Sequence, residues 1–296
     1  MATFAKSTFS AASYAAFRPT YPQQVFTTIL NYHEGPKKLC LDLGCGHGPV
    51  SRTLAASFTS VIGTDPSAGM VKQAISSTAE DNVNFRQASA EDLSFIDDGS
   101  LDLVVAGQAA HWFDYSKVWP ELKRTLRKGG TVAFFGYKDN VFVDYPKATS
   151  IMDHYIYGPG EDLMGMYWEQ PGRNILRDQL RAIEPPEVDF GDVKRLEYEP
   201  GTNGPKSGTL GERLMHKKFN LGQMESYGRT FSAYHGWLEA HPKRTPHAEG
   251  GPGDIIDEMF KKILEAEPEW KKEGDNWREK VVETEWGSAI LLARRK

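Results

Sequence analysis

The chain has 296 residues, a formal net charge of −5, and contents of 40% hydrophobic and 25% charged residues. This composition is typical of a globular protein, and the length is sufficient for one large α/β domain, with or without a cap. The basic residues are dispersed rather than gathered in a stripe, so we expect no nucleic-acid partner.

The sequence predicts neither a targeting segment nor a membrane span. Residues 1–16 lack the basic start and the continuous apolar core of a signal peptide, and no apolar run reaches the roughly 18 residues that a spanning helix requires. A disulfide between Cys40 and Cys45 would distort the turn beside them, so we interpret both as free thiols. We therefore expect a cytoplasmic protein without a membrane partner. The scattered histidines predict no metal site, and the oligomeric state stays open.

The N-terminal region predicts an extended segment that leads into a helix. Residues 14–22 read Y-A-A-F-R-P-T-Y-P, and the two prolines favour extended backbone before the helix begins. The aromatic residues and the arginine of this segment are candidates for ligand binding. Packing tyrosines and a surface arginine are an equally weighted alternative.

The most informative stretch is an apolar run over residues 39–43 that leads into a glycine turn. Gly44, Gly46 and Gly48 follow Asp42 in the pattern D-x-G-x-G-x-G, and a helical spacing of apolar residues comes next. Strand, glycine turn and helix together predict a nucleotide cradle, because glycine lets a ligand approach the backbone closely. The spacing differs from the G-x-G-x-x-G of dinucleotide-binding turns, which argues against an NAD-dependent oxidoreductase.

A second short apolar strand over residues 60–65 ends in an acid, Asp65, which lies 17 residues after Gly48. An acid at this place can accept hydrogen bonds from both hydroxyls of a ribose. A helix over residues 67–77 and a third strand over residues 83–88 are predicted next.

The ends of the third and fourth strands carry further candidates. Glu91 and Asp92 follow the third strand at its carboxyl end, where open parallel sheets bind ligands. The fourth strand, residues 101–108, ends at Gln108 and runs directly into His111. His111 could accept a proton or donate a hydrogen bond at this strand tip. The alternative is a core histidine that packs against aromatic neighbours.

Trp112 and Phe113 could form the wall of a small pocket at the same strand tip. A helix over residues 115–128 and a fifth strand over residues 131–137 are expected to follow. The alternation of strands and helices over residues 39–137 predicts a doubly wound parallel sheet with right-handed crossovers.

This ordered set of strand, D-x-G-x-G-x-G turn, helix, strand and acid resembles the class I S-adenosylmethionine-dependent methyltransferases. The resemblance implies a Rossmann-like α/β fold with a seven-stranded, mostly parallel sheet, S-adenosylmethionine as the cofactor and a small molecule as the substrate. It implies that the glycine turn passes under the methionine part, that Asp65 holds the ribose, and that Glu91 or Asp92 accepts from the adenine amino group. The cofactor-binding candidates are Tyr14, Arg18, Asp42, Gly44, Gly46, Asp65, Glu91, Asp92 and Gln108.

The alternation of strands and helices breaks after residue 137. Residues 138–191 are rich in aromatic residues, Gly and Pro, and an insertion of this size is usually functional. Beyond it we expect a half-exposed strand over residues 193–198, a helix over residues 221–240, a helix over residues 255–266 and a last strand over residues 283–294, which we expect to be antiparallel.

Three stretches are similar to the fungal trans-aconitate methyltransferases: the N-terminal Y-x-x-x-R-P-x-Y-P, the insertion's Y-W-E-Q-P-G-R, and R-T-x-S-A-Y-H-x-W further on. The resemblance implies that the N-terminal segment closes over cofactor and substrate. Aromatic walls with an arginine suit a small planar acid, because guanidinium binds carboxylate in a bidentate fork. Aromatic packing within a cap is the structural alternative. The substrate-binding candidates are Tyr21, Trp112, Tyr157, Trp168, Arg173 and Arg229.

We therefore expect methyl transfer to a small molecule, with a carboxylate as the favoured acceptor. A carboxylate is ionised at pH 7 and needs no base, whereas a phenol, an enol or an amine of a fungal secondary metabolite would need His111 as the base. A non-catalytic regulatory protein that binds the cofactor is the alternative from another class. Four segments are expected: an N-terminal cap segment and helix (residues 1–36), the cofactor-binding core (37–137), a cap insertion (138–191), and the completion of the sheet with cap helices (192–296).

Overall fold

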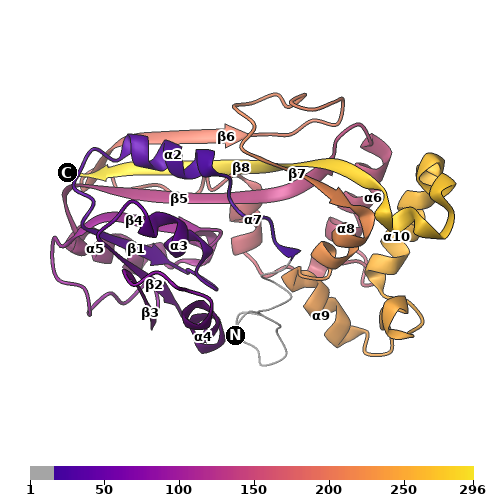
Figure 1. Ribbon diagram of the computed structural model, residues 1–296, viewed down its shortest axis with the longest axis horizontal. Coiled ribbons are helices and arrows are strands. Elements are labelled where there is room, and N and C mark those ends of the chain that lie inside the picture. The colour runs from indigo at the N-terminus through magenta and orange to yellow at the C-terminus, as the bar shows by residue number, and fades with distance from the viewer. Residues whose placement is uncertain (1–16) are drawn as a thin grey trace.

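The computed structural model describes residues 17–296, apart from the side chains of residues 272–275. Its strands form one eight-stranded sheet in the order β3-β2-β1-β4-β5-β8-β6, with β7 also paired to β8 (Figure 1). The strands are β1 (Leu39–Leu43), β2 (Ser60–Asp65), β3 (Val83–Gln87), β4 (Leu101–Gly107), β5 (Leu126–Phe142), β6 (Phe190–Tyr198), β7 (Met215–Asn220) and β8 (Val281–Arg295).

Helices lie on both faces of the parallel part of the sheet and also form a separate cap. The α-helices of the described region are α2 (Gln23–Tyr32), α3 (Pro49–Ala55), α4 (Ala68–Ser76), α5 (Tyr115–Thr125), α6 (Pro146–Tyr157), α7 (Gly172–Arg177), α8 (Leu221–Gly228), α9 (Ser232–Ala240) and α10 (Ile255–Ala266). Short 3-10 segments are η2 (Ala110–Trp112), η3 (Gly165–Tyr167), η4 (His247–Glu249) and η5 (Pro268–Glu279).

The central strand β4 shows why the apolar runs of the sequence form this sheet. Leu103 and Val105 pack on one face with α2 and α3, whereas Val104 and Ala106 pack on the other face with α5. A strand covered on both faces must be apolar at every position, which is the pattern of a buried parallel strand. The pairs β3–β2, β2–β1, β1–β4 and β4–β5 are all parallel, and β8 is antiparallel to β5.

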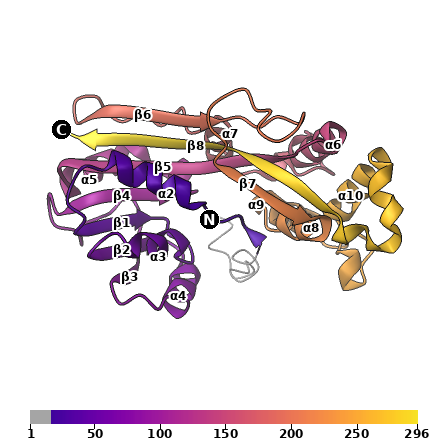
Figure 2. The ribbon, with the colours of Figure 1, turned by 45° about the horizontal axis from the view of Figure 1, so that its top comes forward.

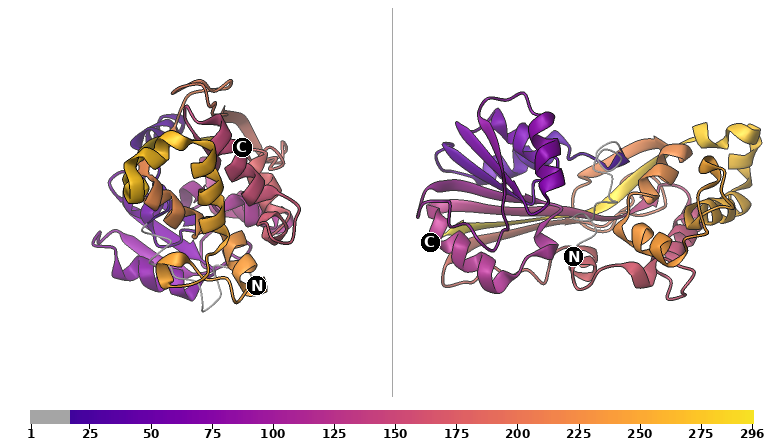
Figure 3. Two further views of the ribbon diagram at one scale, coloured as in Figure 1. Left: turned by 90° about the vertical axis from the view of Figure 1, so that its right-hand side faces the viewer. Right: turned by 90° about the horizontal axis from the view of Figure 1, so that it is seen from below.

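Strands β5 and β8 are much longer than the parallel strands beside them, with 17 and 15 residues. They continue past the parallel core and carry the helices α6 and α8 to α10 at their far end (Figures 2 and 3). The pairing of β5 with β8 shifts register between Tyr137 and Asn140, so Lys138 and Asp139 lie opposite Gly287 alone. This bulge takes Asp139 out of the regular alternation of the strand.

Several expected element boundaries are wrong. The helix predicted over residues 115–128 ends at Thr125, and the chain enters β5 at once, with Gly129 in the left-handed region at φ 74°. The fifth strand extends to Phe142 rather than residue 137, because β8 pairs with it beyond the core. An eighth strand, β7, joins the seven that were expected, because it pairs with the extended part of β8.

The single helix predicted over residues 221–240 is two helices, α8 and α9, with a corner at residues 229–231. The helix predicted over residues 255–266 and the antiparallel last strand are confirmed. Ser67 caps α4 by accepting from the amide of Met70. Across residues 17–296, no helix combines the length and the apolar character needed to cross a membrane.

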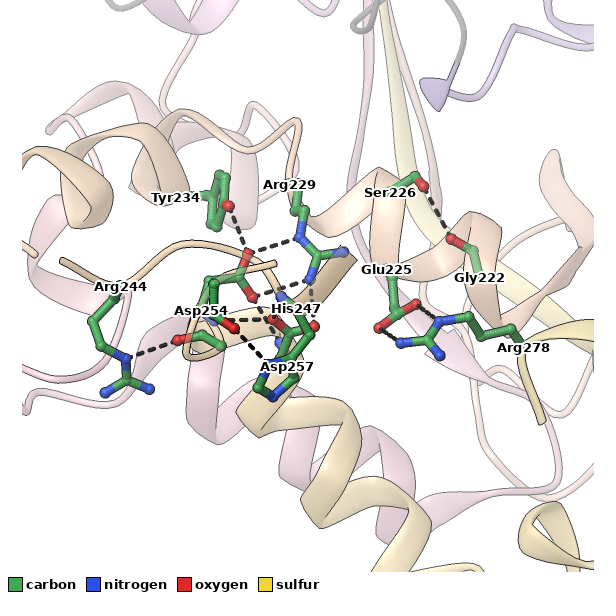
Figure 4. A network of polar contacts seen from close by, with 12 residues as sticks. Gly222, Glu225, Ser226, Arg229, Tyr234, Arg244, His247, Asp254, Asp257 and Arg278 are labelled. Carbon is green, nitrogen blue, oxygen red and sulfur yellow. Dashed lines mark hydrogen bonds and ion pairs between the residues drawn. The ribbon is translucent and has the colours of Figure 1, made fainter. Parts of the chain in front are cut away.

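The corner between α8 and α9 is held by a buried ionic network (Figure 4). Arg229 Nε donates to Asp254 at 2.7 Å and its Nη2 donates to Asp257 at 2.8 Å, while the Tyr234 hydroxyl donates to Asp254 at 2.6 Å. Asp254 and Asp257 also form the capping box of α10. The break in the helix therefore places the Arg229 guanidinium on the N-terminus of α10, where two carboxylates are already buried.

We expect Arg229→Gln to destabilise the protein by about 3–5 kcal/mol, because it leaves two buried carboxylates without their cation. Urea denaturation measures this loss. Lys262→Gln is the control, since Lys262 pairs with Glu265 at 2.9 Å on the open surface, and we expect no measurable change from it. Equal losses of unfolding free energy in the two variants would show that the buried network stabilises the protein no more than a surface ion pair does.

Candidate functional site

A cavity of about 320 Å³ lies at the carboxyl ends of the parallel strands. Loops that follow β1, β2 and β4 form its floor, and residues 18–21 of the N-terminal segment form part of its wall. Seven of the expected cofactor-binding residues line it: Arg18, Asp42, Gly44, Gly46, Asp65, Glu91 and Gln108. The position agrees with the general rule that open parallel sheets bind ligands at this edge.

Asp42 is fully buried at the end of β1 and carries an incomplete set of hydrogen bonds. Its Oδ2 accepts from the Ser51 hydroxyl at 2.6 Å, whereas its Oδ1 has no hydrogen-bond partner among the described residues. Burial raises the pKa of Asp42 to about 7. A buried carboxylate oxygen without a donor is costly, and an ammonium group such as that of S-adenosylmethionine would supply the missing donor.

The glycine turn lies very close to the end of β4. Gly44 is in the left-handed region at φ 65°, and a Cβ atom at Gly44 would lie only 2.4 Å from the Cβ of Ala109. Any larger residue would therefore strain the backbone and push the turn away from β4. The turn leaves an open floor for a ligand, since a Cβ at Gly46 would meet nothing within 4 Å.

Asp65 ends β2 and is oriented by two backbone amides. Its Oδ2 accepts from the Gly46 amide at 2.9 Å and its Oδ1 accepts from the Ser67 amide at 2.8 Å. Burial raises the pKa of Asp65, and these two hydrogen bonds oppose the rise. Each oxygen keeps a lone pair, so the carboxylate can still accept from the two adjacent hydroxyls of a ribose.

Of the two neighbouring acids after β3, the cavity is lined by Glu91 and not by Asp92. Glu91 accepts from the Asp114 amide at 2.9 Å and from the Ser89 hydroxyl, which directs its carboxylate. Asp92 is exposed and accepts from the Ser94 amide at 3.0 Å. The geometry therefore favours Glu91 over Asp92 for contact with a ligand.

Gln108 and Tyr21 form the wall between the core and the N-terminal segment. Gln108 has φ 58°, and its amide group exchanges two hydrogen bonds of 2.8 Å with the backbone of Tyr137 on β5. The Tyr21 ring packs edge-on against Phe135 with 4.6 Å between centroids. The side-chain amide of Gln108 is thus largely occupied by the sheet. Tyr14, the remaining cofactor candidate, lies outside the described residues.

The tip of β4 places Trp112 in the wall of the cavity and His111 directly behind it. The two rings lie 4.7 Å apart, and His111 is 7% exposed. Its Nδ1 is buried and has no hydrogen-bond partner in the described part of the chain. Burial, together with the positive charges of Arg173 and Arg18, lowers the pKa of His111 to about 3. The imidazole is therefore neutral at physiological pH.

Arg173 is the second residue of α7, which begins beside this strand tip. A Cβ at Gly172 would lie 2.7 Å from the Trp112 side chain, so the start of α7 touches the wall of the cavity. The Arg173 guanidinium lies 4.0 Å from the Trp168 ring centroid and donates through Nη2 to Asp139 and to the Tyr157 hydroxyl. Its Nε is buried without a partner among residues 17–296.

Arg18 reaches the cap from the N-terminal segment. Its Nη2 donates to the carbonyl of Thr230 at 3.0 Å, and its guanidinium lies 5.5 Å from the Tyr227 ring and 5.4 Å from the Phe231 ring. Arg18 lines the cavity, and its charge lowers the pKa of His111. It therefore lies between the part of the site expected to bind the cofactor and the part expected to bind the methyl acceptor.

The other substrate candidates divide into two groups. Tyr157 and Trp168 stack at 5.9 Å and enclose Arg173, and the Trp168 Nε1 donates to the Ile156 carbonyl at 2.9 Å. Tyr157, Trp168, Arg173 and Arg229 are all absent from the lining of the cavity, and the Arg229 guanidinium is held by the carboxylates of the α10 cap. Its position therefore favours a structural role.

Sequence reasoning missed two residues that interact with Arg173: Asp139, which accepts from its guanidinium, and Tyr227, which affects its pKa. Asp139 had a detectable signal, since it is an acid within an apolar strand. Tyr227 gave none, because an aromatic residue on a cap helix looks like ordinary packing. Within residues 17–296, no group of three or more His, Cys, Asp or Glu side chains could hold a metal ion.

The chain is similar in sequence to known methyltransferases. Residues 41–134 match the family model described as a methyltransferase domain. The probable S-adenosylmethionine-dependent methyltransferase CRG1 of Saccharomyces cerevisiae is 30% identical over 306 residues, which cover 99% of this chain and 98% of the yeast protein. A methyltransferase of Claviceps purpurea is 28% identical and is covered over 93% of its length.

A solved structure has the same fold. The structure of a candidate type II methyltransferase from Anaeromyxobacter dehalogenans has a TM-score of 0.68 to this chain and 24% sequence identity, with 94% of this chain and 98% of that chain covered. The Rossmann-like α/β architecture with a mostly parallel sheet, expected from the sequence, is confirmed.

We expect Asp42→Asn to stabilise the ligand-free protein at pH 8 and to lower its affinity for S-adenosylhomocysteine about 10- to 100-fold. The folded-state pKa of about 7 exceeds the ordinary aspartate pKa of 3.8, so ionisation of Asp42 costs folding free energy progressively as the pH rises from about 4 to 7. Because asparagine does not ionise, the substitution should raise the free energy of unfolding by on the order of 4 kcal/mol at pH 8 and by almost nothing at pH 4.

Thermal melts at both pH values and calorimetric titration with S-adenosylhomocysteine measure the two effects. Asp92→Asn is the matched control, because this acid is exposed beside the same cavity, and it should change neither quantity. Unchanged affinity of Asp42→Asn would remove Asp42 from the ligand site.

Proposed function

Because this chain belongs to the class I S-adenosylmethionine-dependent methyltransferases, we propose that it methylates a carboxylate oxygen of a small planar acid of the trans-aconitate type. The observation that carries this proposal is the pair of guanidinium groups of Arg18 and Arg173: Arg18 lines the cavity, and Arg173 directly follows Gly172, which packs against Trp112 in the cavity wall. A dry, positively charged strand tip favours an anionic acceptor over a neutral or cationic one.

The cavity residues fit the cofactor of this family. We assign Asp42 to the amino group, Asp65 to the ribose hydroxyls and Glu91 to the adenine side, with the turn from Gly44 below the methionine part. Bound S-adenosylmethionine supplies an electrophilic methyl group on a sulfonium. The orphaned oxygen of Asp42 and the open floor at Gly46 support this assignment.

The charge state of His111 favours a carboxylate over a phenol or an amine. A carboxylate is already an anionic nucleophile at pH 7, so the protein only has to orient it and exclude water. A phenol needs a proton acceptor, and an imidazole with a pKa of about 3 accepts protons poorly at neutral pH. His111 acts in this proposal as a neutral hydrogen-bonding group beside the acceptor.

The cap residues position the acceptor and keep the reacting atoms dry. Arg173 is held by Asp139 on one side and by the Trp168 ring on the other, so its guanidinium is preorganised. The Arg18 to Tyr21 segment covers the cavity between the cap and the core. Fixed donors around an in-line nucleophile are what methyl transfer requires.

We expect label from S-adenosyl-[methyl-³H]methionine to appear on trans-aconitate or a related planar acid as a base-labile methyl ester. The measurement separates esters from ethers by mild alkaline hydrolysis and screens acids and polyketide phenols in parallel. Base-stable label on a phenol, with no acid labelled, would replace the carboxylate proposal by phenol methylation.

With an acid as acceptor, we expect kcat at saturation of both substrates to be flat between pH 6 and 9, since neither the acceptor nor His111 titrates there. The His111→Gln variant should lower kcat and keep the flat profile, because glutamine preserves a hydrogen-bonding group but no base. A limb with an apparent pKa of 6–7 that disappears in His111→Gln would identify His111 as a general base.

A further inference from the structure

Three buried polar groups around the Arg18 guanidinium have unused hydrogen-bonding capacity. His111 and Arg173 each bury a ring or guanidinium nitrogen without a partner in the described chain. A third group is the hydroxyl of Tyr227 on α8, which is 3% exposed. It accepts from the Trp286 indole at 3.1 Å, and no acceptor for its own proton lies among residues 17–296. We call His111, Arg173 and Tyr227 the donor cluster.

The members of the donor cluster come from three elements, and Arg173 connects them, because its charge affects the pKa of both His111 and Tyr227. The Tyr227 ring lies 5.0 Å from Phe231, which lies 5.7 Å from Trp168, the ring against which Arg173 packs. Burial raises the pKa of Tyr227, and the charges of Arg18 and Arg173 both oppose that rise. The Arg18 guanidinium lies 5.5 Å from the centroid of the Tyr227 ring, so positive charge lies directly beside this side chain.

The Tyr227 ring is fixed by its aromatic neighbours, so its hydroxyl has a defined position. Phe219 stacks on it at 6.3 Å, and Trp286 and Phe231 meet it edge-on at 6.1 and 5.0 Å. The Trp286 indole donates to the hydroxyl oxygen, which polarises the O–H bond and strengthens it as a donor. The hydroxyl is therefore a strong donor whose position is fixed by the packing of the ring.

Buried groups with unused donors are rare in native proteins, because each loses its hydrogen bonds to water without replacement. Several of them around the Arg18 and Arg173 guanidinium groups match a ligand that brings acceptors and negative charge. The Arg173 guanidinium has no acceptor atom and the Tyr227 oxygen already accepts from Trp286, so an ammonium or amine would find few acceptors here. The chemistry of the cluster therefore selects an oxyanion.

We propose that Tyr227 donates a hydrogen bond to the methyl acceptor and completes, with Arg173 and His111, a site for the oxyanion of that acceptor. This inference rests on the proposed function for the identity of the acceptor, and it adds a residue that neither sequence motifs nor the cavity lining indicated. Tyr227 binds and orients the acceptor without transferring a proton, since the carboxylate oxygen is the nucleophile.

Tyr227→Phe tests the proposal, because it removes one oxygen and keeps the ring that packs against Phe219, Phe231 and Trp286. The protein loaded with S-adenosylhomocysteine is titrated calorimetrically with trans-aconitate, cinnamate and the neutral analogue cinnamamide. We expect the acid that binds wild type best to bind the variant about 10- to 100-fold more weakly, as for loss of a hydrogen bond to a charged group. Affinity for S-adenosylhomocysteine should be unchanged, and cinnamamide should bind wild type more weakly than cinnamate.

Tyr234→Phe is the matched control, since it also removes a buried tyrosine hydroxyl, one bonded to Asp254 at 2.6 Å in the Arg229 network. It should lower Tm without changing affinity for the acids. In turnover, Tyr227→Phe should raise KM for the acid by the same factor as the binding loss, with kcat changed less.

Two results would overturn the inference: equal affinity of the acids for wild type and Tyr227→Phe, or no binding of either acid to wild type. These outcomes are separate from the test of the proposed function. Acid binding that depends on Tyr227, without ester formation, would sustain the oxyanion site and reject carboxylate methylation. Ester formation with unchanged affinity in Tyr227→Phe would support carboxylate methylation and reject Tyr227 as part of the oxyanion site.

Discussion

The site depends on the antiparallel pairing of β5 with β8. The ladder begins in the core, where Thr131 pairs with Arg294, and continues into the cap, where Phe142 pairs with Thr284. Cap and core therefore share one hydrogen-bonded sheet rather than a flexible linker. The bulge within this ladder carries Asp139, which binds Arg173, so a core strand determines where the guanidinium of the cap lies.

Opposite charges occupy the two sides of the site, and both are shielded from water. Asp42 is a fully buried acid on the cofactor side, and Arg173 and Arg18 supply positive charge beside His111 on the other side. Electrostatic interactions strengthen as water is removed. A cation at Asp42 and an anion at the arginines would each recover free energy that the ligand-free fold loses.

Hydrogen-bond satisfaction separates Arg173, which we propose to bind the acceptor, from Arg229 in the network beside α10. Arg229 donates to two carboxylates that also cap α10, and the network around it is complete (Figure 4). Arg173 is tied to Asp139 on one side yet keeps a buried nitrogen without a partner in the described chain. A satisfied buried network stabilises the fold, whereas an unsatisfied one is tolerated where a ligand completes it.

The sequence alone determined the parallel core, because its signals are local: apolar runs fold as buried strands, Gly44 needs a left-handed backbone, and Asp65 ends a strand. The same locality explains the Ser67 cap of α4 and the confirmed helix of residues 255–266. Only the tertiary structure decided the length of β5, the break before α9 and the partners of Arg229, since each depends on residues far away in the chain. It also decided the surroundings of His111 and Tyr227, because desolvation and unused hydrogen bonds exist only once distant elements have packed together.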